Sequence, residues 1–338
     1  MIFRVLAALL LAAAPVGAFV PMSPGTTPLV GGEISQYQGV EPPPADCNDA
    51  AGYVGPGDCA SYTAWWGLRA YSAAVAATGT QAAVDLRRVS DSATCTALIG
   101  TSGDLDLTVG TPCGGSTVTA WIGASTATVS KIYDQTNGSA CSAASCDLVQ
   151  ATTSRQPQLL LTGGGGSGTR PYLSKNAGND GAMVGANNFI PNAAFEMSLS
   201  IMASRNTSNT SRFLRSNSNG GTDGIGMTTI GGTEAWGLSG CLVAATDSVW
   251  HAGNGRAANG VINGTTFNVD GVEGVCITSI GDNAGVGAPP QILNPVGIGA
   301  AVMLFGEGGF ADNALWSSGL RTSLCHNQRL YWGTPGTC

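Results

Sequence analysis

The sequence predicts an all-β protein, a single antiparallel β-sandwich with one helix near its start. Short runs rich in β-branched and apolar residues recur along the chain, and clusters of Gly, Asn, Ser and Thr separate them. That alternation is typical of strands joined by turns. The 50 glycines and the 10% share of charged residues indicate a turn-rich chain with a sparsely charged surface. No internal repeat or second domain boundary is visible, so one sandwich accounts for the globular part.

The chain begins like an exported protein. A basic residue precedes a short apolar run that ends at Ala14, and small residues then lead to an expected cleavage after Ala18. The run is too short to cross a bilayer, which takes about 20 helical residues; an uncleaved anchor is the alternative. We predict a signal peptide over 1–18, a proline-rich arm over 19–46 and a β-sandwich domain over 47–338. The expected location is secreted, extracellular or periplasmic, with no membrane span after signal cleavage.

Charge limits the partners that the chain can bind. The formal net charge is −7, and lysine occurs only as Lys131 and Lys175. Nucleic acids and anionic membranes need clustered Lys and Arg, so neither is an expected partner. A neutral surface suits a glycan, and it equally suits an inert exported scaffold. No cofactor is expected, because the glycine tract at 163–168 lacks the Lys-Ser/Thr of a phosphate-binding loop and predicts a flexible turn.

Ten cysteines in an exported chain are expected to form five disulfides. Zinc is the alternative, but no Cys-x-x-Cys pair exists, and His251 and His326 lie far apart in sequence. Asp104 and Asp106 alone are too few ligands to indicate calcium, so no metal is expected. Pairing of sequence neighbours gives the expected bridges: Cys47–Cys59, Cys95–Cys113, Cys141–Cys146, Cys241–Cys276 and Cys325–Cys338.

Local patterns predict one helix and a series of strands. The alanine-rich run over 60–77 predicts a helix that Asp58 or Ser61 would cap and Gly79 would end, packed across a sheet. The expected strands lie at 117–122, 128–133, 158–161, 197–203, 224–230, 260–269 and 296–305.

The most informative segment reads Ile-Tyr-Asp-Gln-Thr-Asn-Gly and covers residues 132–138. It predicts a strand that runs into a polar turn, in which Asp134 bonds the backbone of its own loop. Leu-Arg-Arg-Val-Ser-Asp precedes it at 86–91, and Leu-Val-Gln-Ala follows it at 148–151. We call residues 132–138 the signature.

The signature and its neighbours resemble the catalytic domain of the α-L-arabinofuranosidase B family, a lectin-like sandwich of the concanavalin A-like jelly-roll type. The resemblance is strong over 47–161 and covers the remainder in outline. It implies that Cys47 and Cys59 form the first disulfide, that 68–72 belong to a helix, and that 86–91 form the first strand and its turn. This chain carries Cys141 and Cys146 after the signature, whereas the family has its short-range cysteine pair before it.

The resemblance implies a hydrolase that removes terminal arabinofuranosyl units from polysaccharide with retention, which needs two carboxyl groups about 5–5.5 Å apart. The family nucleophile is a Glu that follows a Trp-Gly. Trp236-Gly237 matches that Trp-Gly, but residues 248–269 contain no carboxylate. Glu234 is the candidate nucleophile; a simple turn carboxylate is the alternative.

The family acid/base is an Asp in a Gly-Gly-Asp-Asn turn. The local match at 280–283 makes Asp282 the candidate, although an Asp-Asn turn commonly bonds its own backbone. By distance from the C-terminus, residues 297–301 fit better but offer only alanine at the Asp position. Glu307 is the nearest carboxylate after them and is the third catalytic candidate.

Trp236, Trp250 and Asn254 are the candidates for sugar contact, and burial in the sandwich is the alternative for both tryptophans. The adjacent Cys-Cys pair that borders the family's sugar pocket is absent. Two functions therefore stay open. One is a secreted arabinofuranosidase acting on arabinose-containing glycan. The other is a non-catalytic carbohydrate-binding or cell-surface module on the same sandwich.

Overall fold

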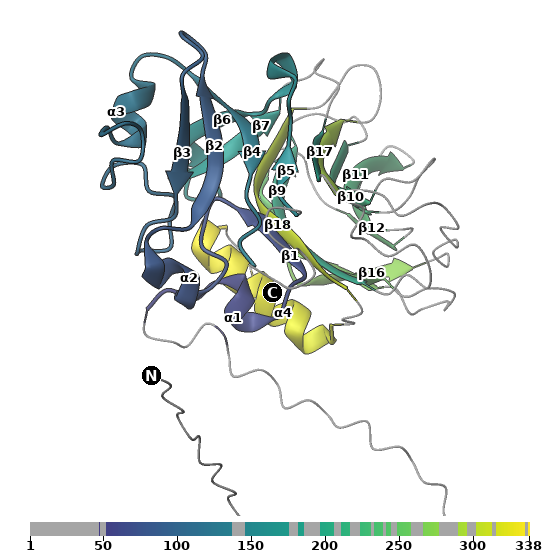
Figure 1. Ribbon diagram of the computed structural model, residues 1–338. Helices are drawn as coiled ribbons and strands as arrows, with labels where there is room; N and C mark the ends of the chain where they lie inside the picture. The colour runs from purple at the N-terminus through teal and green to yellow at the C-terminus, as the bar shows by residue number, and fades with distance from the viewer. Residues whose placement is uncertain are drawn as a thin grey trace, which may run out of the picture. The chain divides into compact units, whose positions relative to one another are not determined.

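Strands make up most of the described chain, as the sequence predicts. The computed structural model describes residues 47, 52–136, 146–175, 182–185, 197–205, 211–216, 224–230, 233–238, 241–244, 249–257, 266–276, 290–295, 302–312, 316–334 and 337–338. These residues belong to the unit Glu41–Cys338. They form an antiparallel β-sandwich with a few helices at its periphery (Figure 1).

The bounds of the elements are as follows. The strands of the first half are β1 Ala64–Gly67, β2 Ala82–Arg88, β3 Thr94–Leu98, β4 Ala127–Ile132, β5 Leu148–Val149, β6 Gln158–Gly164, β7 Arg170–Lys175 and β8 Met183–Gly185. Those of the second half are β9 Met197–Arg205, β10 Ser211–Ser216, β11 Gly224–Ile230, β12 Thr233–Leu238, β13 Cys241–Ala244, β14 His251–Ala257, β15 Thr266–Val269, β16 Val272–Cys276, β17 Pro290–Pro295 and β18 Met303–Asp312. The helices are α1 Pro56–Cys59, α2 Ala73–Thr78, α3 Val118–Ile122, α4 Ser318–Trp332 and the 3-10 turn η1 Thr153–Arg155.

The strand pairings close on themselves. From β18 they run through β7, β6, β4, β5, β8, β17, β10, β11, β12, β13, β16, β15, β14 and β9 and return to β18. Two branches leave this circuit: β2 and β3 extend from β4, and β1 pairs with β18. A closed circuit satisfies the hydrogen-bonding groups along its strands without leaving sheet edges.

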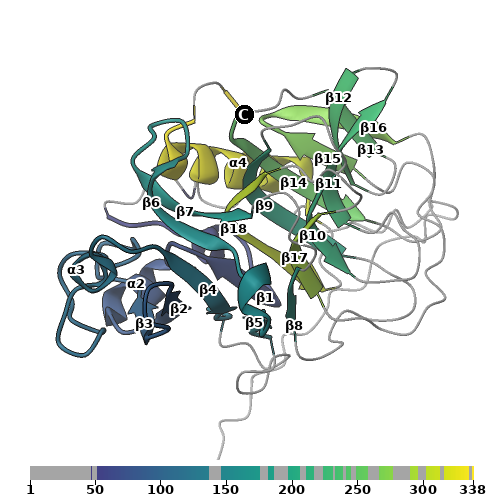
Figure 2. The same ribbon diagram turned by 90° about the horizontal axis from the view of Figure 1, so that it is seen from above.

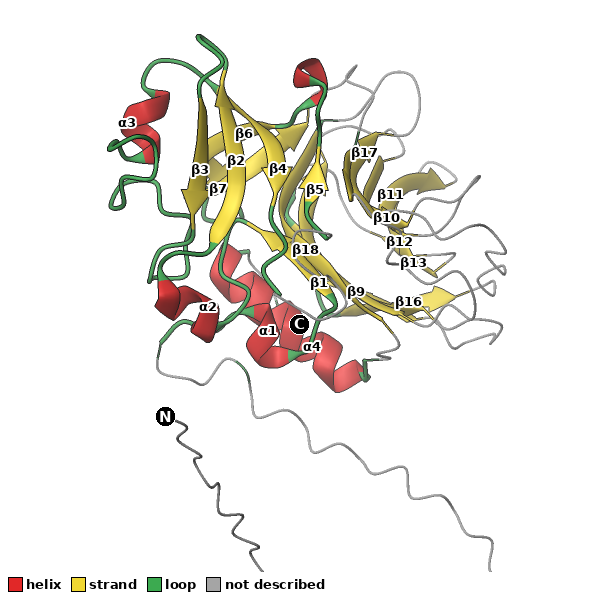
Figure 3. Cartoon of the chain, in the orientation of Figure 1, coloured by secondary structure: helices red, strands yellow, loops and turns green. Residues whose placement is uncertain are grey.

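Apolar side chains fill the interior of the sandwich, and two smaller apolar clusters lie under α4. The interior core joins residues of opposite walls, such as Leu86, Val129, Ile201 and Phe305, all fully buried. Helix α4 packs on the outer face of the wall that contains β14, and α1 contacts α4 (Figures 2 and 3). None of the described helices has the length and apolar character that a membrane crossing requires.

The helix expected over 60–77 is wrong for most of its length. Residues 64–67 form β1, which places Trp65 against α4 and Trp66 in the interior core, both without exposure. Two consecutive buried tryptophans need the alternating faces of a strand, and this outweighs the helix propensity of the alanines. Helix α2 begins only after the cap Ser72, so residues 68–72 are not helical, and it ends at Gly79 as expected.

Other element predictions are confirmed or corrected in turn. Strands β4, β6, β9 and β11 lie where they are expected. Residues 117–122 form α3, capped by the Thr117 hydroxyl, instead of a strand. The glycine tract at 163–168 packs closely against the end of α4. A Cβ on Gly165 would lie 2.0 Å from the carbonyl oxygen of Trp332.

The disulfide predictions hold where the structure describes both partners. Cys47–Cys59, Cys95–Cys113 and Cys325–Cys338 are bonded as expected. Cys241 and Cys276 face each other in the β13–β16 register. Cys146 is disulfide-bonded, and its expected partner Cys141 lies outside the described residues.

The signature forms hydrogen bonds along the edge of β1 that does not pair with β18. We call this set of hydrogen bonds the clamp. The backbone N–H of Gln135 donates to the carbonyl of Trp65 at 3.0 Å. The Gln135 side chain accepts from the N–H of Tyr71 at 2.9 Å and donates to the carbonyl of Gly67 at 2.8 Å. The Asp134 carboxylate accepts from the Trp65 N–H at 2.9 Å. Side chains thus take the place of a neighbouring strand.

Burial sets the ionisation of Asp134. It raises the pKa of this carboxyl above its usual value, against the lowering effect of hydrogen bonds from Trp65 and Thr136, and the nearby Asp147 charge raises it further. Asp147 accepts from the Asp134 N–H at 2.9 Å and pairs with Lys131 at 2.7 Å. Asp147 therefore connects the Lys131 ammonium group to the backbone of the signature.

Replacing Gln135 with Ala tests the clamp. The change leaves the Tyr71 N–H and the Gly67 carbonyl without their partner, and each orphaned group costs about 1–3 kcal/mol. We expect urea denaturation to show a loss of about 2–4 kcal/mol in the free energy of unfolding. Gln81→Ala is the matched control, because Gln81 bonds only the carbonyl of its neighbour Ala82. Equal losses in both variants would contradict the clamp.

Asp134→Asn tests the pH dependence. An acid with a raised pKa in the folded state destabilises the fold as pH rises from the unfolded pKa through the folded one. Asn keeps an acceptor for the Trp65 N–H and does not titrate. We expect the stability of Asp134→Asn relative to wild type to increase as the pH rises above about 4, the usual pKa of an unfolded Asp, measured by urea unfolding at several pH values. A difference independent of pH would refute this assignment.

Candidate functional site

Three candidate residues meet on the outer sheet face that α4 covers. The strand register aligns polar and small residues in two rows across β1, β18, β9 and β14. One row is Trp65, Gly309, Ser200 and Asn254; the next is Gly67, Glu307, Met202 and Ala252. Trp250 precedes β14 and packs with Met202, Ala252 and Trp332. The structure thus brings Glu307, Asn254 and Trp250 under one helix.

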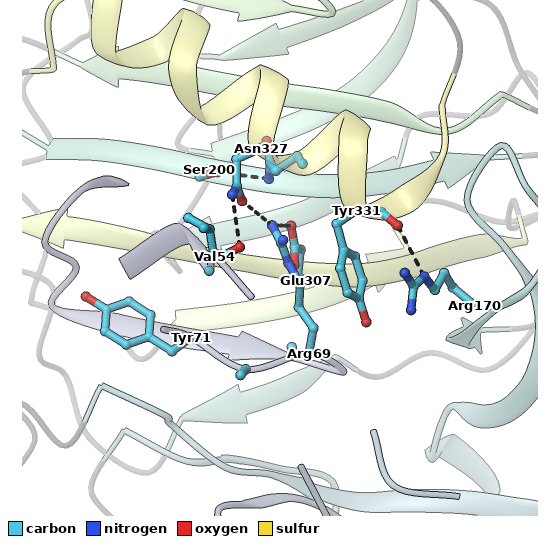
Figure 4. Close-up of polar contacts among 12 residues, drawn as sticks. Val54, Arg69, Tyr71, Arg170, Ser200, Glu307, Asn327 and Tyr331 are labelled. Carbon is cyan, nitrogen blue, oxygen red and sulfur yellow. Dashed lines mark hydrogen bonds and ion pairs between the residues drawn. The ribbon is translucent and has the colours of Figure 1, made fainter. Parts of the chain in front are cut away.

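Glu307 forms a buried ion pair with Arg69 (Figure 4). Both side chains have no exposure. Arg69 Nε donates to Oε2 and Nη2 donates to Oε1 at 2.7 Å, while Nη2 also donates to the amide oxygen of Asn327 on α4 at 2.8 Å. Both carboxylate oxygens are therefore bound, and the pair connects β1, β18 and α4. This geometry gives Glu307 a role in positioning α4.

Two glycines and a bulge make room for this pair. The β9–β18 register shifts between Phe305 and Glu307, so one extra residue lies at Gly306. A bulge of this kind re-aims the following side chains. A Cβ on Gly306 would lie 2.4 Å from the Trp332 ring, and one on Gly67 would lie 3.0 Å from the Glu307 Cβ. Larger residues at either position would displace Glu307 or α4.

An aromatic ring continues the network toward the surface. Tyr331 lies between two guanidinium groups, with Arg69 at 4.5 Å and Arg170 at 4.0 Å from its ring centroid (Figure 4). Its hydroxyl donates to Asp104 at 2.7 Å, and Arg170 binds the same carboxylate oxygen at 2.5 Å. Burial raises the pKa of Tyr331, which keeps the phenol protonated as a donor. Asp104 is thus bound by both Tyr331 and Arg170.

Asn254 belongs to a closed hydrogen-bond triangle. The Ser200 hydroxyl donates to Asn254 Oδ1 at 2.7 Å, and Asn254 Nδ2 donates to the Gln328 carbonyl oxygen at 3.0 Å. Gln328 Nε2 in turn donates to the Ser200 hydroxyl at 3.0 Å. All three side chains are fully buried. The triangle fixes the register of α4 on β9 and β14.

Trp250 and the histidine that follows it complete the surface on which α4 packs. The Trp250 ring stacks on Trp332 with centroids 5.5 Å apart and an interplanar angle of 10°. His251 Nδ1 lies 2.6 Å from Asp270 Oδ2, and Arg329 of α4 binds the other oxygen at 3.0 Å. Sequence reasoning missed this contact, although the Asp-Gly turn at Asp270 was a visible signal for a hairpin tip.

The remaining candidates lie elsewhere. Glu234 and Trp236 are on β12, and the structure describes their backbone: Glu234 pairs with Thr229, and Trp236 pairs with Met227 and with the core residue Val243. Asp282 lies outside the described residues. Among the candidates whose side chains the structure describes, Glu307, Asn254 and Trp250 lie under α4.

Wherever the structure describes a carboxylate side chain, that group is bound by a donor of the protein. Backbone N–H groups, hydroxyls or basic side chains supply these donors. The carboxylates are Asp58, Asp85, Asp91, Asp104, Asp106, Asp134, Asp147, Asp270, Glu273 and Glu307. Within the described ranges no group of three or more His, Cys, Asp or Glu is arranged to hold a metal ion. Under α4, Arg69 binds both oxygens of Glu307, and His251 and Arg329 bind the two oxygens of Asp270.

Comparisons with known proteins identify the fold. No protein-family model and no curated protein matches the sequence. Among solved structures, an arabinofuranosidase complexed with arabinofuranosyl-α-1,2-xylobiose matches with a TM-score of 0.52 at 15% identity. A GH54 α-L-arabinofuranosidase soaked with a cyclic sulfate inhibitor gives 0.52 at 14% identity.

Each of these matches covers 81% of this chain but only 64% of the enzyme. At this identity the likeness establishes a shared fold. The described chain therefore has the β-sandwich fold of the GH54 arabinofuranosidases, as the signature predicts, and it spans less than two thirds of their length.

A double-mutant cycle tests the ion pair. Replacing either Arg69 or Glu307 with Ala leaves the charge of the other residue buried and unpaired. This lowers the free energy of unfolding by about 3–5 kcal/mol. We expect Arg69→Ala with Glu307→Ala to lose much less than the sum of the single variants, because neither charge is then buried alone. Denaturant unfolding measures the three values. The exposed pair Arg88 and Asp91 is the control, for which we expect a coupling of about 0–1 kcal/mol. Additive losses at Arg69 and Glu307 would rule out direct coupling.

Proposed function

We propose that this chain is an exported carbohydrate-active protein that removes terminal arabinofuranosyl units from polysaccharide with retention. The observation that carries the proposal is the sandwich shared with arabinofuranosidases over 81% of the chain. The signature residues that led to this family from the sequence also build part of that sandwich. Three disulfides are compatible with an oxidising, extracellular or periplasmic location.

The proposed catalytic pair is Glu234 as nucleophile and Asp282 as acid/base, with Trp236 contacting the sugar. Glu307 is withdrawn from this role because Arg69 binds both of its oxygens. Chain length permits the pair. Leu238 of β12 pairs with Cys241, and Cys241 pairs with Cys276. Glu234 lies four residues before Leu238 on β12, which is about 13 Å away at roughly 3.3 Å per residue.

The segment after Cys276 is long enough to cover that distance. Asp282 follows Cys276 by six positions, and six extended residues span roughly 20 Å. A retaining mechanism would bring the two carboxyl groups to about 5–5.5 Å. Glu234 would then attack the anomeric carbon, and Asp282 would protonate the leaving oxygen and later activate water.

Glycan binding without catalysis is the second candidate function. The observation that favours it is the occupation of every described carboxylate side chain by donors of the protein. A lectin-like sandwich can bind sugar through hydroxyl, amide and aromatic groups alone. In this case Trp236 would still contact the glycan, and Glu234 and Asp282 would only stabilise turns.

Turnover of an aryl arabinofuranoside tests the proposal. We expect the wild type to release the aryl group, and Glu234→Gln and Asp282→Asn each to lower kcat by about a hundredfold or more. Asp91→Asn is the matched control, because Asp91 is an exposed carboxylate bound to Arg88, and it should keep full activity. Proton NMR of the first product should show the α anomer.

Two results would count against the proposal. Wild-type protein that binds arabinoxylan without releasing arabinose supports the non-catalytic function. Full activity in both Glu234→Gln and Asp282→Asn would exclude this pair as the catalytic carboxylates, since each variant keeps the side-chain shape but loses the ionisable group.

A further inference from the structure

Tyr133 of the signature takes no part in the clamp. It follows β4 directly after the buried residue Ile132, and its side chain lies on the outer face of β2, β3 and β4. Residues of these strands alternate between the interior core and this outer face: Val84 and Leu86 are fully buried, whereas Asp85 between them is partly exposed. The face is open enough that part of each outer side chain reaches solvent.

A bulge adds a cation to this face. The β2–β4 register shifts between Asp85 and Leu86, so that Ser130 and Lys131 together oppose Asp85. Both are only partly buried, and the core side chains Val129 and Ile132 flank them. A bulge re-aims a side chain that regular alternation would send into the core. Lys131 therefore lies beside Asp85 and Tyr133.

The side chains on this face hold one another in place. The Tyr133 hydroxyl donates to Asp85 at 3.0 Å, and the Thr96 hydroxyl donates to the same carboxylate at 2.6 Å. Lys131 Nζ lies 4.1 Å from the Tyr133 ring centroid and 2.7 Å from Asp147. Partial burial and then the Asp85 charge raise the pKa of Tyr133, which keeps its phenol neutral. The ring is thus fixed from two sides.

The chemistry of this face fits a neutral polyhydroxyl ligand. Asp85 and Asp147 balance Lys131 and Arg87, so the face has no excess charge for a nucleic acid or an anionic membrane. What remains is an aromatic ring beside a carboxylate, an ammonium group and several hydroxyls: Thr94, Thr96, Thr128 and Ser130. These groups occupy adjacent strands about 4.8 Å apart, a spacing that suits successive hydroxyls of a sugar chain.

We propose that Tyr133, Asp85, Lys131 and Thr96 form a binding patch for a neutral polysaccharide chain, on the face opposite to the interior core. The ring contacts a sugar face, the Asp85 carboxylate accepts from sugar hydroxyls, and Lys131 donates to sugar oxygens. The patch rests on the proposed action on glycans, but it requires neither Glu234 nor Asp282. It holds polymer to the protein while any cleavage happens elsewhere.

Affinity electrophoresis in gels that contain soluble arabinoxylan tests the patch with the full chain. We expect Tyr133→Ala to weaken retardation by about tenfold in the dissociation constant and Lys131→Ala by about threefold. The exposed loop residue Val109, which is outside the patch, supplies the control Val109→Ala. Melting temperatures check that each variant is folded. If Tyr133→Ala does not fold, the arabinoxylan affinity of Lys131→Ala tests the patch.

The outcome separates this patch from catalysis. Turnover of the small aryl arabinofuranoside should stay within about twofold of wild type in both patch variants, since the proposed patch holds polymer and takes no part in cleavage. If the patch variants lose arabinoxylan binding and even the wild type shows no aryl turnover, the patch is supported and the hydrolase proposal is excluded. Unchanged arabinoxylan affinity in Tyr133→Ala and Lys131→Ala, or no binding of arabinoxylan by wild type, overturns the patch.

Discussion

Strand β1 has hydrogen-bond partners on both edges because the signature binds the edge that β18 leaves open. Much else depends on this contact. The clamp holds Trp65 against α4 and Trp66 in the interior core, and it leads the chain to Arg69. Arg69 then binds Glu307 and Asn327, so the clamp also sets where α4 rests. A loop side chain, Gln135, thereby connects the sandwich interior to its covering helix.

The contact between α4 and the sheet is unusual because polar groups fill much of it. Ion pairs at Glu307 and Asp270 and the triangle at Asn254 supply most of these contacts, while Arg69 Nη1 and Arg329 Nε are buried without a hydrogen-bond partner. A buried polar network of this kind costs desolvation, and its gain is a single allowed register of the helix. An apolar helix could slide on an apolar sheet. Here a shift by one residue would leave several charges and amides unpaired.

Sequence patterns predicted the sandwich, four strands in place and the disulfides that can be checked. They failed where tertiary contacts decide. Trp65 and Trp66 impose a strand on an alanine-rich run, and α4 gave no signal because its buried face carries Arg321, Gln328 and Arg329 instead of an apolar stripe. The catalytic candidate Glu307 and the sugar-contact candidate Asn254 both lie under α4. Their role depended on a bulge and on α4, neither of which spacing along the chain can reveal.

The closed circuit of strands affects how the protein behaves among its own copies. Unpaired strand edges invite other copies of a chain to add on. Among the described pairings, β1 is closed by the signature, which leaves β3 as the end of its branch. That strand is five residues long, and the Cys95–Cys113 disulfide ties it to the following loop. A short, tethered terminal strand offers little template for aggregation.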